Sequence, residues 1–293
     1  MRFALRMVLL TAMMPLVALG FPPRNDPTVQ KGIVYSRVDK TELKLDIVQP
    51  VGDGPFPLII WFHGGGYQAG DRQDFMDTML SLAKKGYAGA SIDYRLAPKH
   101  KWPAQLEDAR AALAFLREKA KEYKIDPDRV GVAGGSAGGH LALMLGLAPR
   151  DGKQAGIRAV VNIFGPSDFS TLTPTDLGNE ILRQVLGRDI NGVLLDLLGT
   201  SDRNAKIMKE ASPITYVAKG NPPVLTLHGS EDPLCPLSQS KVLHEALRKA
   251  GVPEKLLVIE GAGHDATWPA DKRDMVNRTM FEFLDKHLKQ QSK

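Results

Sequence analysis

A serine set among glycines is the first group in the chain whose surroundings point to covalent chemistry. The apolar run VGVA at 130–133, typical of a buried strand, leads directly into GGSAG at 134–138 and then into a helical pattern. G-x-S-x-G at a strand-to-helix junction makes a sharp turn that holds the serine hydroxyl exposed in a strained backbone conformation. A glycine-rich junction can instead bind a phosphate. Such loops need a lysine followed by serine or threonine, or a G-x-G-x-x-G pattern with an acidic residue further along the chain, and neither is present. We therefore expect Ser136 to be a nucleophile.

A serine hydroxyl needs a general base, and the base needs an acid that orients it. Where the serine occupies a turn of this kind, the acid and then the histidine follow it along the chain. His264 comes after EGAG at 260–263, a glycine-rich exit from a predicted strand, at the sheet edge where ligands bind. We predict that His264 is the base. The other histidines after the serine are assigned to packing, a strand end or helix surfaces: His140, His228, His244 and His287.

Two neighbouring carboxylates are candidates for the orienting acid. The segment HGSEDP at 228–233 leaves the strand that precedes the strand of His264. Asp232 lies further into this loop than Glu231, and the PLCP that begins at 233 stiffens the chain after it. We predict that Asp232 is the acid and interpret Glu231 as a solvated loop charge. Asp168, which follows an earlier strand, is a weaker candidate.

A second glycine-rich loop supplies candidate donors for a developing negative charge. Acyl transfer creates an oxyanion that must be met by fixed hydrogen-bond donors. The segment HGGG at 63–66 leaves a buried strand, and its glycines let backbone N–H groups approach a substrate. We predict an oxyanion hole formed by the amides of Gly64, Gly65 and Ala137. Alone, HGGG fits any flexible loop; together with the serine turn it indicates acyl transfer.

The elements that must position these groups alternate between strands and helices. An alternating apolar–polar pattern predicts an edge hairpin at 33–38 and 43–48, and the later apolar runs predict strands that helices cover on both faces. This order predicts an α/β fold with a mostly parallel central sheet of about eight strands. The later strands are expected at 57–62, 87–92, 129–133, 158–164, 223–228 and 255–259, and the helices at 104–121, 137–147, 236–250 and 274–288.

We expect one folded domain over 31–293, preceded by a proline-bearing linker at 21–30. Within the domain, the segment 165–215 carries leucines and valines at helical spacing and is predicted to be a cap or insertion. The composition fits a soluble globular protein, with 24% charged and 43% hydrophobic residues. The net charge is +5, but the basic residues are scattered, so no nucleic-acid partner is expected. A single cysteine, Cys235, excludes a disulfide framework and a cysteine-rich zinc site.

The first twenty residues have the pattern of a secretory signal peptide. Arg2 and Arg6 precede an apolar run at 7–19, and the triplet 18–20, with small residues at both of its ends, comes just before the expected cleavage site after Gly20. The run is shorter than the roughly 20 residues that a membrane-spanning helix needs. We therefore expect a secreted or periplasmic protein that is not stably inserted in a membrane.

Six motifs occur along the chain in a characteristic order: HGGG at 63–66, DYRLAP at 93–98, GGSAGGH at 134–140, ASPI at 211–214, HGSED at 228–232 and GAGH at 261–264. With these motifs the sequence resembles the α/β-hydrolase esterases, in particular the bacterial acetyl/feruloyl esterase and hormone-sensitive-lipase-like group, from about Ile33 to the last helix. The resemblance implies an α/β-hydrolase fold, in which 93–98 brace the oxyanion loop and Asp108 holds its helix in place. Tyr67 stands where many relatives have Trp. Cys235 stands where relatives often have Val, and we interpret it as a packing residue.

The motifs and the resemblance together predict a secreted serine carboxylesterase that works through an acyl-enzyme. The expected substrates are short-chain or aryl esters, with acetyl or feruloyl groups on xylan-type polysaccharides as the specific hypothesis. The alternative is an amide hydrolase of the same fold, such as an arylformamidase or exopeptidase, because the same triad serves both reactions. A non-catalytic binding member of the fold usually lacks the serine or the histidine, and both are present here. No metal or organic cofactor is expected, and the oligomeric state is left open.

Overall fold

A computed structural model describes residues 26–150 and 152–289. The predicted signal peptide at 1–20 lies outside the described residues. The chain forms one eight-stranded sheet in the order β1-β2-β4-β3-β5-β6-β7-β8, which confirms the predicted fold class. The strands are β1 (Thr28–Val38), β2 (Thr41–Gln49), β3 (Phe56–Phe62), β4 (Ala88–Ile92), β5 (Ile125–Gly135), β6 (Ala159–Ile163), β7 (Val224–Gly229) and β8 (Glu254–Ile259).

The sheet is antiparallel only where it begins. β2 pairs antiparallel with both β1 and β4, whereas β4, β3, β5, β6, β7 and β8 are parallel to one another. The parallel strands are connected through helices, so their carboxyl ends lie at the same edge of the sheet. That edge receives the loops after β3, β5, β7 and β8, which carry the predicted site residues.

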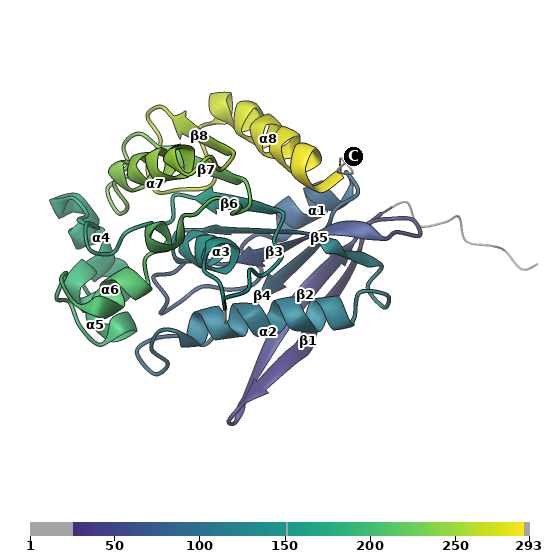
Figure 1. Ribbon diagram of the computed structural model, residues 1–293, viewed down its shortest axis with the longest axis horizontal. Coiled ribbons are helices and arrows are strands. Elements are labelled where there is room, and N and C mark those ends of the chain that lie inside the picture. The colour runs from purple at the N-terminus through teal and green to yellow at the C-terminus, as the bar shows by residue number, and fades with distance from the viewer. Residues whose placement is uncertain (1–25, 151, 290–293) are drawn as a thin grey trace, which may run out of the picture.

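Helices cover both faces of the sheet, which explains why the central strands are almost continuously apolar. Helices α2 (Ala104–Glu118), α3 (Ala137–Leu147) and α7 (Ser238–Lys249) pack on one face, in a core that includes Ile60 and Val132. Helices α1 (Met76–Ala83) and α8 (Ala270–Leu284) pack on the other face, around Ile59 and Trp61. In Figure 1, α1 and α8 accordingly lie on the opposite side of the sheet from α2. A short π-helix, η2 (Asp285–Lys289), continues α8.

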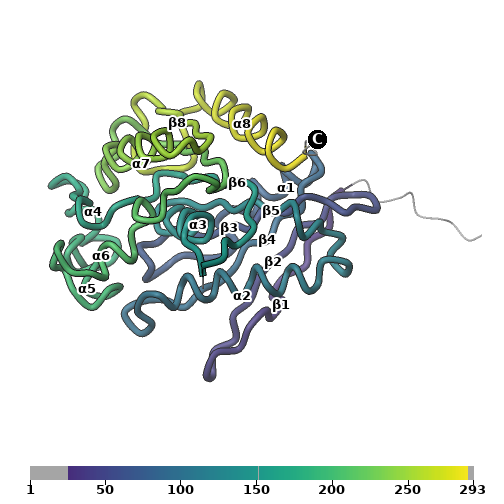
Figure 2. The backbone as a smooth tube through the Cα atoms, viewed as in Figure 1, coloured from purple at the N-terminus to yellow at the C-terminus, as the bar shows by residue number. Residues whose placement is uncertain are grey.

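Between β6 and β7 the chain leaves the sheet and forms a small helical layer. It consists of α4 (Asp176–Leu186), α5 (Ile190–Leu198), α6 (Lys206–Glu210) and the 3₁₀ helix η1 (Pro213–Tyr216). The three α-helices fall within the segment 165–215, and η1 extends one residue beyond it; we call α4, α5 and α6 the cap. Figure 2 follows the cap as the teal and green segment at one end of the molecule. Its apolar side chains, among them Ile190 and Leu194, form a third core cluster together with Phe169, which precedes α4.

The structure differs from the predicted elements at several places, one of which is α8, which begins at Ala270, four residues before the predicted start. β1 begins at Thr28, inside the range expected for the linker, because Thr28 to Gln30 pair with the end of β2. β5 begins at Ile125, where that residue pairs with Phe56 of β3. Helix α1 was not predicted, since its eight residues bury only Met79, Leu82 and Ala83 and carry little of the periodic pattern that marks a long helix.

Candidate active site

Ser136 lies at the sharp turn between β5 and α3 and has the strained backbone that its motif predicts. Its φ and ψ are 54° and −120°, a region that costs a non-glycine residue about 1–3 kcal/mol. The Ser136 amide donates to the Ile163 carbonyl at 2.9 Å, which ties the turn to β6. A Cβ on Gly138 would lie 2.0 Å from the Phe62 carbonyl oxygen, so only glycine allows α3 to begin this close to β3. The turn therefore fixes the serine at the edge of the sheet.

The HGGG loop after β3 lies directly beside the serine turn. A Cβ built on Gly64 would be 3.6 Å from Ser136 Cβ, so the backbone of this loop is in contact with the turn. The Gly65 carbonyl accepts hydrogen bonds from the amides of Gln68 and Ala69, both at 3.0 Å. These bonds turn the loop back on itself and fix its backbone next to Ser136.

Residues 93–98 brace this loop, as the resemblance implies. Tyr94 Oη donates to the His63 carbonyl at 2.9 Å, and its ring stacks on the His63 ring at 4.2 Å between centroids. The Ala97 amide donates to the Tyr67 carbonyl at 2.9 Å, just after the glycines. The loop is thus held from both sides by one segment.

Two arginine clusters anchor the bracing segment in turn. Arg72 forms ion pairs with Asp46 and Asp93, each at 2.8 Å. On the other side of Tyr94, the Arg95 guanidinium pairs with Asp108 of α2, and the Arg95 amide also donates to that carboxylate at 2.8 Å. Asp108 therefore connects α2 to the bracing segment, which fits the structural role that the resemblance implies.

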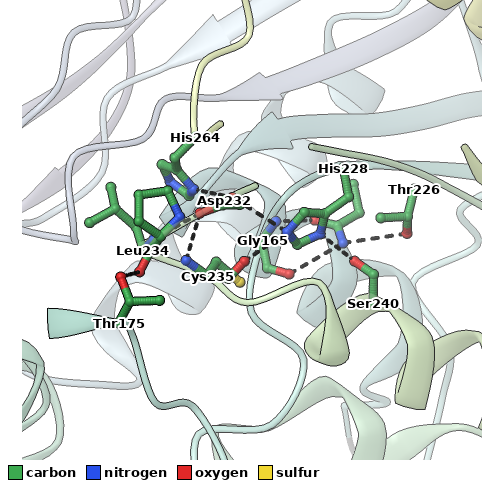
Figure 3. A network of polar contacts seen from close by, with 11 residues as sticks. Gly165, Thr175, Thr226, His228, Asp232, Leu234, Cys235, Ser240 and His264 are labelled. Carbon is green, nitrogen blue, oxygen red and sulfur yellow. Dashed lines mark hydrogen bonds and ion pairs between the residues drawn. The ribbon is translucent and has the colours of Figure 1, made fainter. Parts of the chain in front are cut away.

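His264 and Asp232 are in direct contact. His264 Nδ1 donates to Asp232 Oδ2 at 2.6 Å, and Asp232 Oδ1 accepts from the amides of Leu234 and Cys235, both at 2.9 Å (Figure 3). Burial raises the pKa of the Asp232 carboxyl, but hydrogen bonds from His228 and His264 outweigh this and hold that pKa well below its usual range. Asp232 is therefore a fixed carboxylate at neutral pH, with its charge directed at His264.

The other two candidate acids lie elsewhere. Glu231 is exposed, and its backbone amide donates to the Ala262 carbonyl at 2.9 Å. The Asp168 carboxylate accepts from the amide and the hydroxyl of Ser170 at 2.9 and 2.6 Å. Of the three carboxylates considered, Asp232 alone contacts His264.

A second histidine, His228, also contacts Asp232, and sequence reasoning gave it no part in the site. The His228 ring is fully buried, with Nε2 2.7 Å from the Cys235 carbonyl oxygen and 3.3 Å from Asp232 Oδ2. Its Nδ1 lies 2.6 Å from the Ser240 hydroxyl. Its place in HGSED, four residues before the acid, is the only signal in the sequence that could have identified it.

The remaining histidines have structural partners. His140 is fully buried in α3, where Nε2 donates to the Ala211 carbonyl at 2.6 Å, and burial lowers its pKa to about 4. His244 is also buried and bonds to Glu254 and to the Thr226 hydroxyl, so the helix-surface or packing assignment is resolved as packing. His287 lies in η2 and packs edge-on against Phe283.

Ser136 and His264 line the same cavity, which has a volume of about 240 Å³ and walls that are mostly apolar. Within the described residues the Ser136 hydroxyl has no hydrogen bond to the His264 ring, so the two residues are related by the cavity that they both line. Gly65 and Ala137 also line this cavity, whereas Gly64 is placed only by its contact with the serine turn. The remaining walls come mainly from the cap and its surroundings: Phe169, Leu172, Ile181, Leu182, Val185, Leu186, Ile190, Val193 and Leu194.

The two departures from the family pattern both occur at this cavity. Tyr67 is buried and lines the wall next to the glycine loop, and its backbone has a φ of 65°. Cys235 lines the wall beside Leu234, and burial raises the pKa of its thiol well above the usual range. The thiol is therefore protonated at neutral pH, which is consistent with a packing residue.

The cap is attached to the loop that carries the acid. The amide and the hydroxyl of Thr175 donate to the Pro233 carbonyl at 3.0 and 3.3 Å. Thr175 also begins α4, since its hydroxyl accepts from the Gly178 amide. The other end of α4 is closed by Gly187 in the left-handed conformation.

In the ranges that the structure describes, no helix is long and apolar enough to cross a membrane.

Comparison with known proteins places this geometry in a family. A model of the BD-FAE family matches residues 45–247. Esterase LipC of Mycobacterium tuberculosis is 33% identical over 72% of the chain and 53% of its own length, and Esterase LipQ of the same organism is 31% identical over 67% and 46%. The chain thus spans about half the length of these curated relatives.

A solved structure covers nearly the whole of both chains. Esterase Est2 of the planctomycete Thermogutta terrifontis, with propionate bound, superimposes with a TM-score of 0.71 and 26% identity, over 92% of this chain and 98% of Est2. The family match includes the glycine loop, Ser136 and Asp232, and the structural match extends over the sheet and its helices. The chain therefore belongs to the BD-FAE family and has the α/β-hydrolase fold of these esterases.

Proposed function

We propose that the protein is a serine carboxylesterase. The observation that carries this proposal is the single cavity lined by Ser136 and His264, with His264 bonded to the buried carboxylate of Asp232. A nucleophile, a base and an acid arranged in this way perform acyl transfer. The LipC, LipQ and Est2 names support hydrolysis of carboxylic esters as the reaction.

In the proposed reaction Ser136 Oγ attacks the ester carbonyl carbon while His264 Nε2 takes the hydroxyl proton. The carbonyl oxygen becomes an oxyanion that accepts from the amides of Gly64, Gly65 and Ala137. The C–O bond to the alcohol then breaks, His264 returns the proton to the leaving alkoxide, and an acyl-serine remains. Water repeats the sequence with His264 as base and releases the carboxylic acid. Asp232 holds the His264 ring throughout and stabilises its charged form.

The proposed substrates are short-chain or aryl esters. A cavity of about 240 Å³ with mostly apolar walls accommodates a small acyl group and offers little to bind a charged one. Structures of Est2 with propionate and with butyrate support the same range. Acetyl or feruloyl groups on xylan-type polysaccharides are the specific substrates that we propose, and export through the predicted signal peptide at 1–20 would bring the enzyme to them.

Replacing Ser136 by Ala tests the reaction. We expect kcat on p-nitrophenyl acetate to fall on the order of 10⁶-fold, and covalent labelling by a fluorophosphonate to disappear. The exposed Ser81 provides a control, since Ser81→Ala should label and turn over like the unmodified protein. Retention of labelling in the Ser136 variant would contradict the proposal.

A substrate panel tests the acyl and alcohol groups. We expect turnover of p-nitrophenyl acetate and butyrate, methyl ferulate and acetylated xylan, and little turnover of long-chain lipids. Formanilides and peptide anilides distinguish an amide hydrolase of the same fold, and faster turnover of these than of esters would overturn the ester assignment. Export is tested by expressing the full chain in a bacterium with a periplasm and determining where the protein accumulates and whether residues 1–20 are removed.

A further inference from the structure

We propose that His228 is a positioning residue for Asp232: it shares the Asp232 Oδ2 atom with His264 and ties the acid loop to β7 and α7. The inference rests on the proposed function, since it assigns Asp232 a task in the reaction. Its basis is the hydrogen-bond geometry of a fully buried ring that the triad itself does not include (Figure 3).

The neighbours of the ring determine which of its nitrogens carries the proton. Nε2 faces the Cys235 carbonyl at 2.7 Å and Asp232 Oδ2 at 3.3 Å, and both of these atoms only accept. Nε2 therefore bears a hydrogen, directed mainly at Cys235 and partly at Asp232. The Ser240 hydroxyl, 2.6 Å from Nδ1, can donate to it. Ser240 is itself fully buried, so this contact links the ring to α7 without water.

With His228 in place, both carboxylate oxygens of Asp232 face more than one polar group. Oδ1 accepts from the amides of Leu234 and Cys235, whereas Oδ2 accepts from His264 Nδ1 and lies 3.3 Å from His228 Nε2. Cys235 is held twice, because its amide binds Asp232 and its carbonyl binds His228. The turn 232–235 is therefore stabilised by hydrogen bonds to the Asp232 carboxylate and is bonded to His228 at the end of β7. These contacts oppose rotation of the carboxylate away from His264.

A donor on Oδ2 also moderates the charge that His264 meets. His228 withdraws part of the negative charge from the same oxygen that binds His264 Nδ1. Without this donor, more of the carboxylate charge faces His264 Nδ1, so Oδ2 stabilises the charged ring that forms during the reaction more strongly. The other charged groups nearby are Asp265, which accepts from the Thr267 amide, and the exposed Glu231. The aromatic ring of Phe164 covers one face of His264 at 4.3 Å between centroids.

The test compares His228→Ala with His228→Gln on p-nitrophenyl acetate. We expect His228→Ala to lower kcat about 10- to 100-fold, as the loss of an orienting partner does elsewhere, with KM little changed. The acid limb of the kcat/KM profile should move to higher pH. A glutamine amide can donate from the position of Nε2–H. His228→Gln should therefore recover most of kcat and restore the acid limb to its position in the unmodified protein.

His244→Ala is the matched control, because His244 is also a buried histidine on the same face of the sheet but does not contact Asp232. It should lower the melting temperature and leave the acid limb unchanged. If His228→Ala behaves in the same way, with an unmoved acid limb, the inference is overturned. If the Ala variant does not fold, His228→Asn replaces it. The shorter amide does not reach the Nε2 position, so equal activity of the Asn and Gln variants also overturns the inference.

An NMR measurement separates this inference from the proposed function. The low-field proton resonance of the His264–Asp232 hydrogen bond is observable whether or not an ester is hydrolysed. We expect it to shift in His228→Gln and to broaden or disappear in His228→Ala, and to stay in place in His244→Ala. A protein that does not hydrolyse esters but shows this pattern contradicts the proposed function alone, whereas an active protein with an unchanged resonance in His228→Ala contradicts the role of His228.

Discussion

The Tyr94 hydroxyl donates to the His63 carbonyl at 2.9 Å, and the two rings stack, so a side chain after β4 fixes the start of the glycine loop after β3. Because Gly64 follows His63 directly, this bond determines where the proposed oxyanion donors lie. The relationship makes the loop rigid before a substrate arrives, and preorganised donors are the most effective ones.

Tyr94→Phe should therefore lower kcat about tenfold, less than the roughly 10²–10³-fold that losing an oxyanion donor itself costs. KM should change little, because the donors meet the oxyanion and not the bound ester. Steady-state kinetics on p-nitrophenyl butyrate provide the measurement. Tyr216→Phe is the control, since that hydroxyl donates to the Glu210 carbonyl, outside the bracing segment. An effect confined to KM would argue that the loop only binds substrate.

Asp232→Asn should lower kcat about 10⁴-fold, the loss seen when a triad histidine is held in the wrong tautomer. The asparagine can present an N–H group to His264 Nδ1, which then cannot keep its own hydrogen. Asp168→Asn tests the rejected candidate and should keep normal turnover, because that carboxylate bonds to Ser170. A larger loss in the Asp168 variant than in the Asp232 variant would reassign the acid.

His140 should make the protein less stable in mild acid. Its folded pKa of about 4 is below the value of about 6.5 in an unfolded chain, so the unfolded state binds more protons between these values. The contribution to the free energy of unfolding is complete above pH 6.5 and is lost as the pH falls toward 4. Urea unfolding at pH 7 and at pH 5 checks this. Between these two pH values the free energy of unfolding should fall less in His140→Gln than in the unmodified protein. An equal loss in both would contradict this assignment.

Leu186 should limit the length of the acyl group. A Cβ built on Gly66 would lie 2.5 Å from Leu186 Cδ1, so this side chain reaches from α4 onto the glycine loop and narrows the cavity. Leu186→Ala should raise the ratio of kcat/KM on hexanoate to that on acetate by about tenfold or more, since each methylene that fits is worth about 10-fold or more. Leu177→Ala on the same helix is the control, because Leu177 is 64% exposed and does not line the cavity.

The sequence predicts the parts of the site that local patterns encode. The turn at Ser136 follows from the spacing of the glycines, and the order of the strands along the chain follows from the apolar runs. The strained φ of Ser136 agrees with its motif. The choice of Asp232 over Glu231 depended on position in a loop, and the structure places Asp232 against His264.

The rest depends on contacts between segments that are distant in the sequence. His228 lies in an apolar strand, and nothing local indicates that Ser240 and Cys235 will surround it. Helix α1 is short and buries few residues, so its stability comes from packing on β2 and β4 and leaves little periodic signal. The early start of β1 similarly depends on pairing with Gln49, which only the folded sheet provides.

The bond between Thr175 and the Pro233 carbonyl connects the start of α4 to the loop that carries the acid. Pro233 follows Asp232 directly, so a cap that lifted at Thr175 would pull on the loop that orients His264. At the other end of α4 the Leu186 side chain reaches the glycine loop, and Gly187 ends the helix. A longer acyl group that displaced only the Leu186 side chain would leave the bond at Thr175, and with it the contact between Asp232 and His264, unchanged.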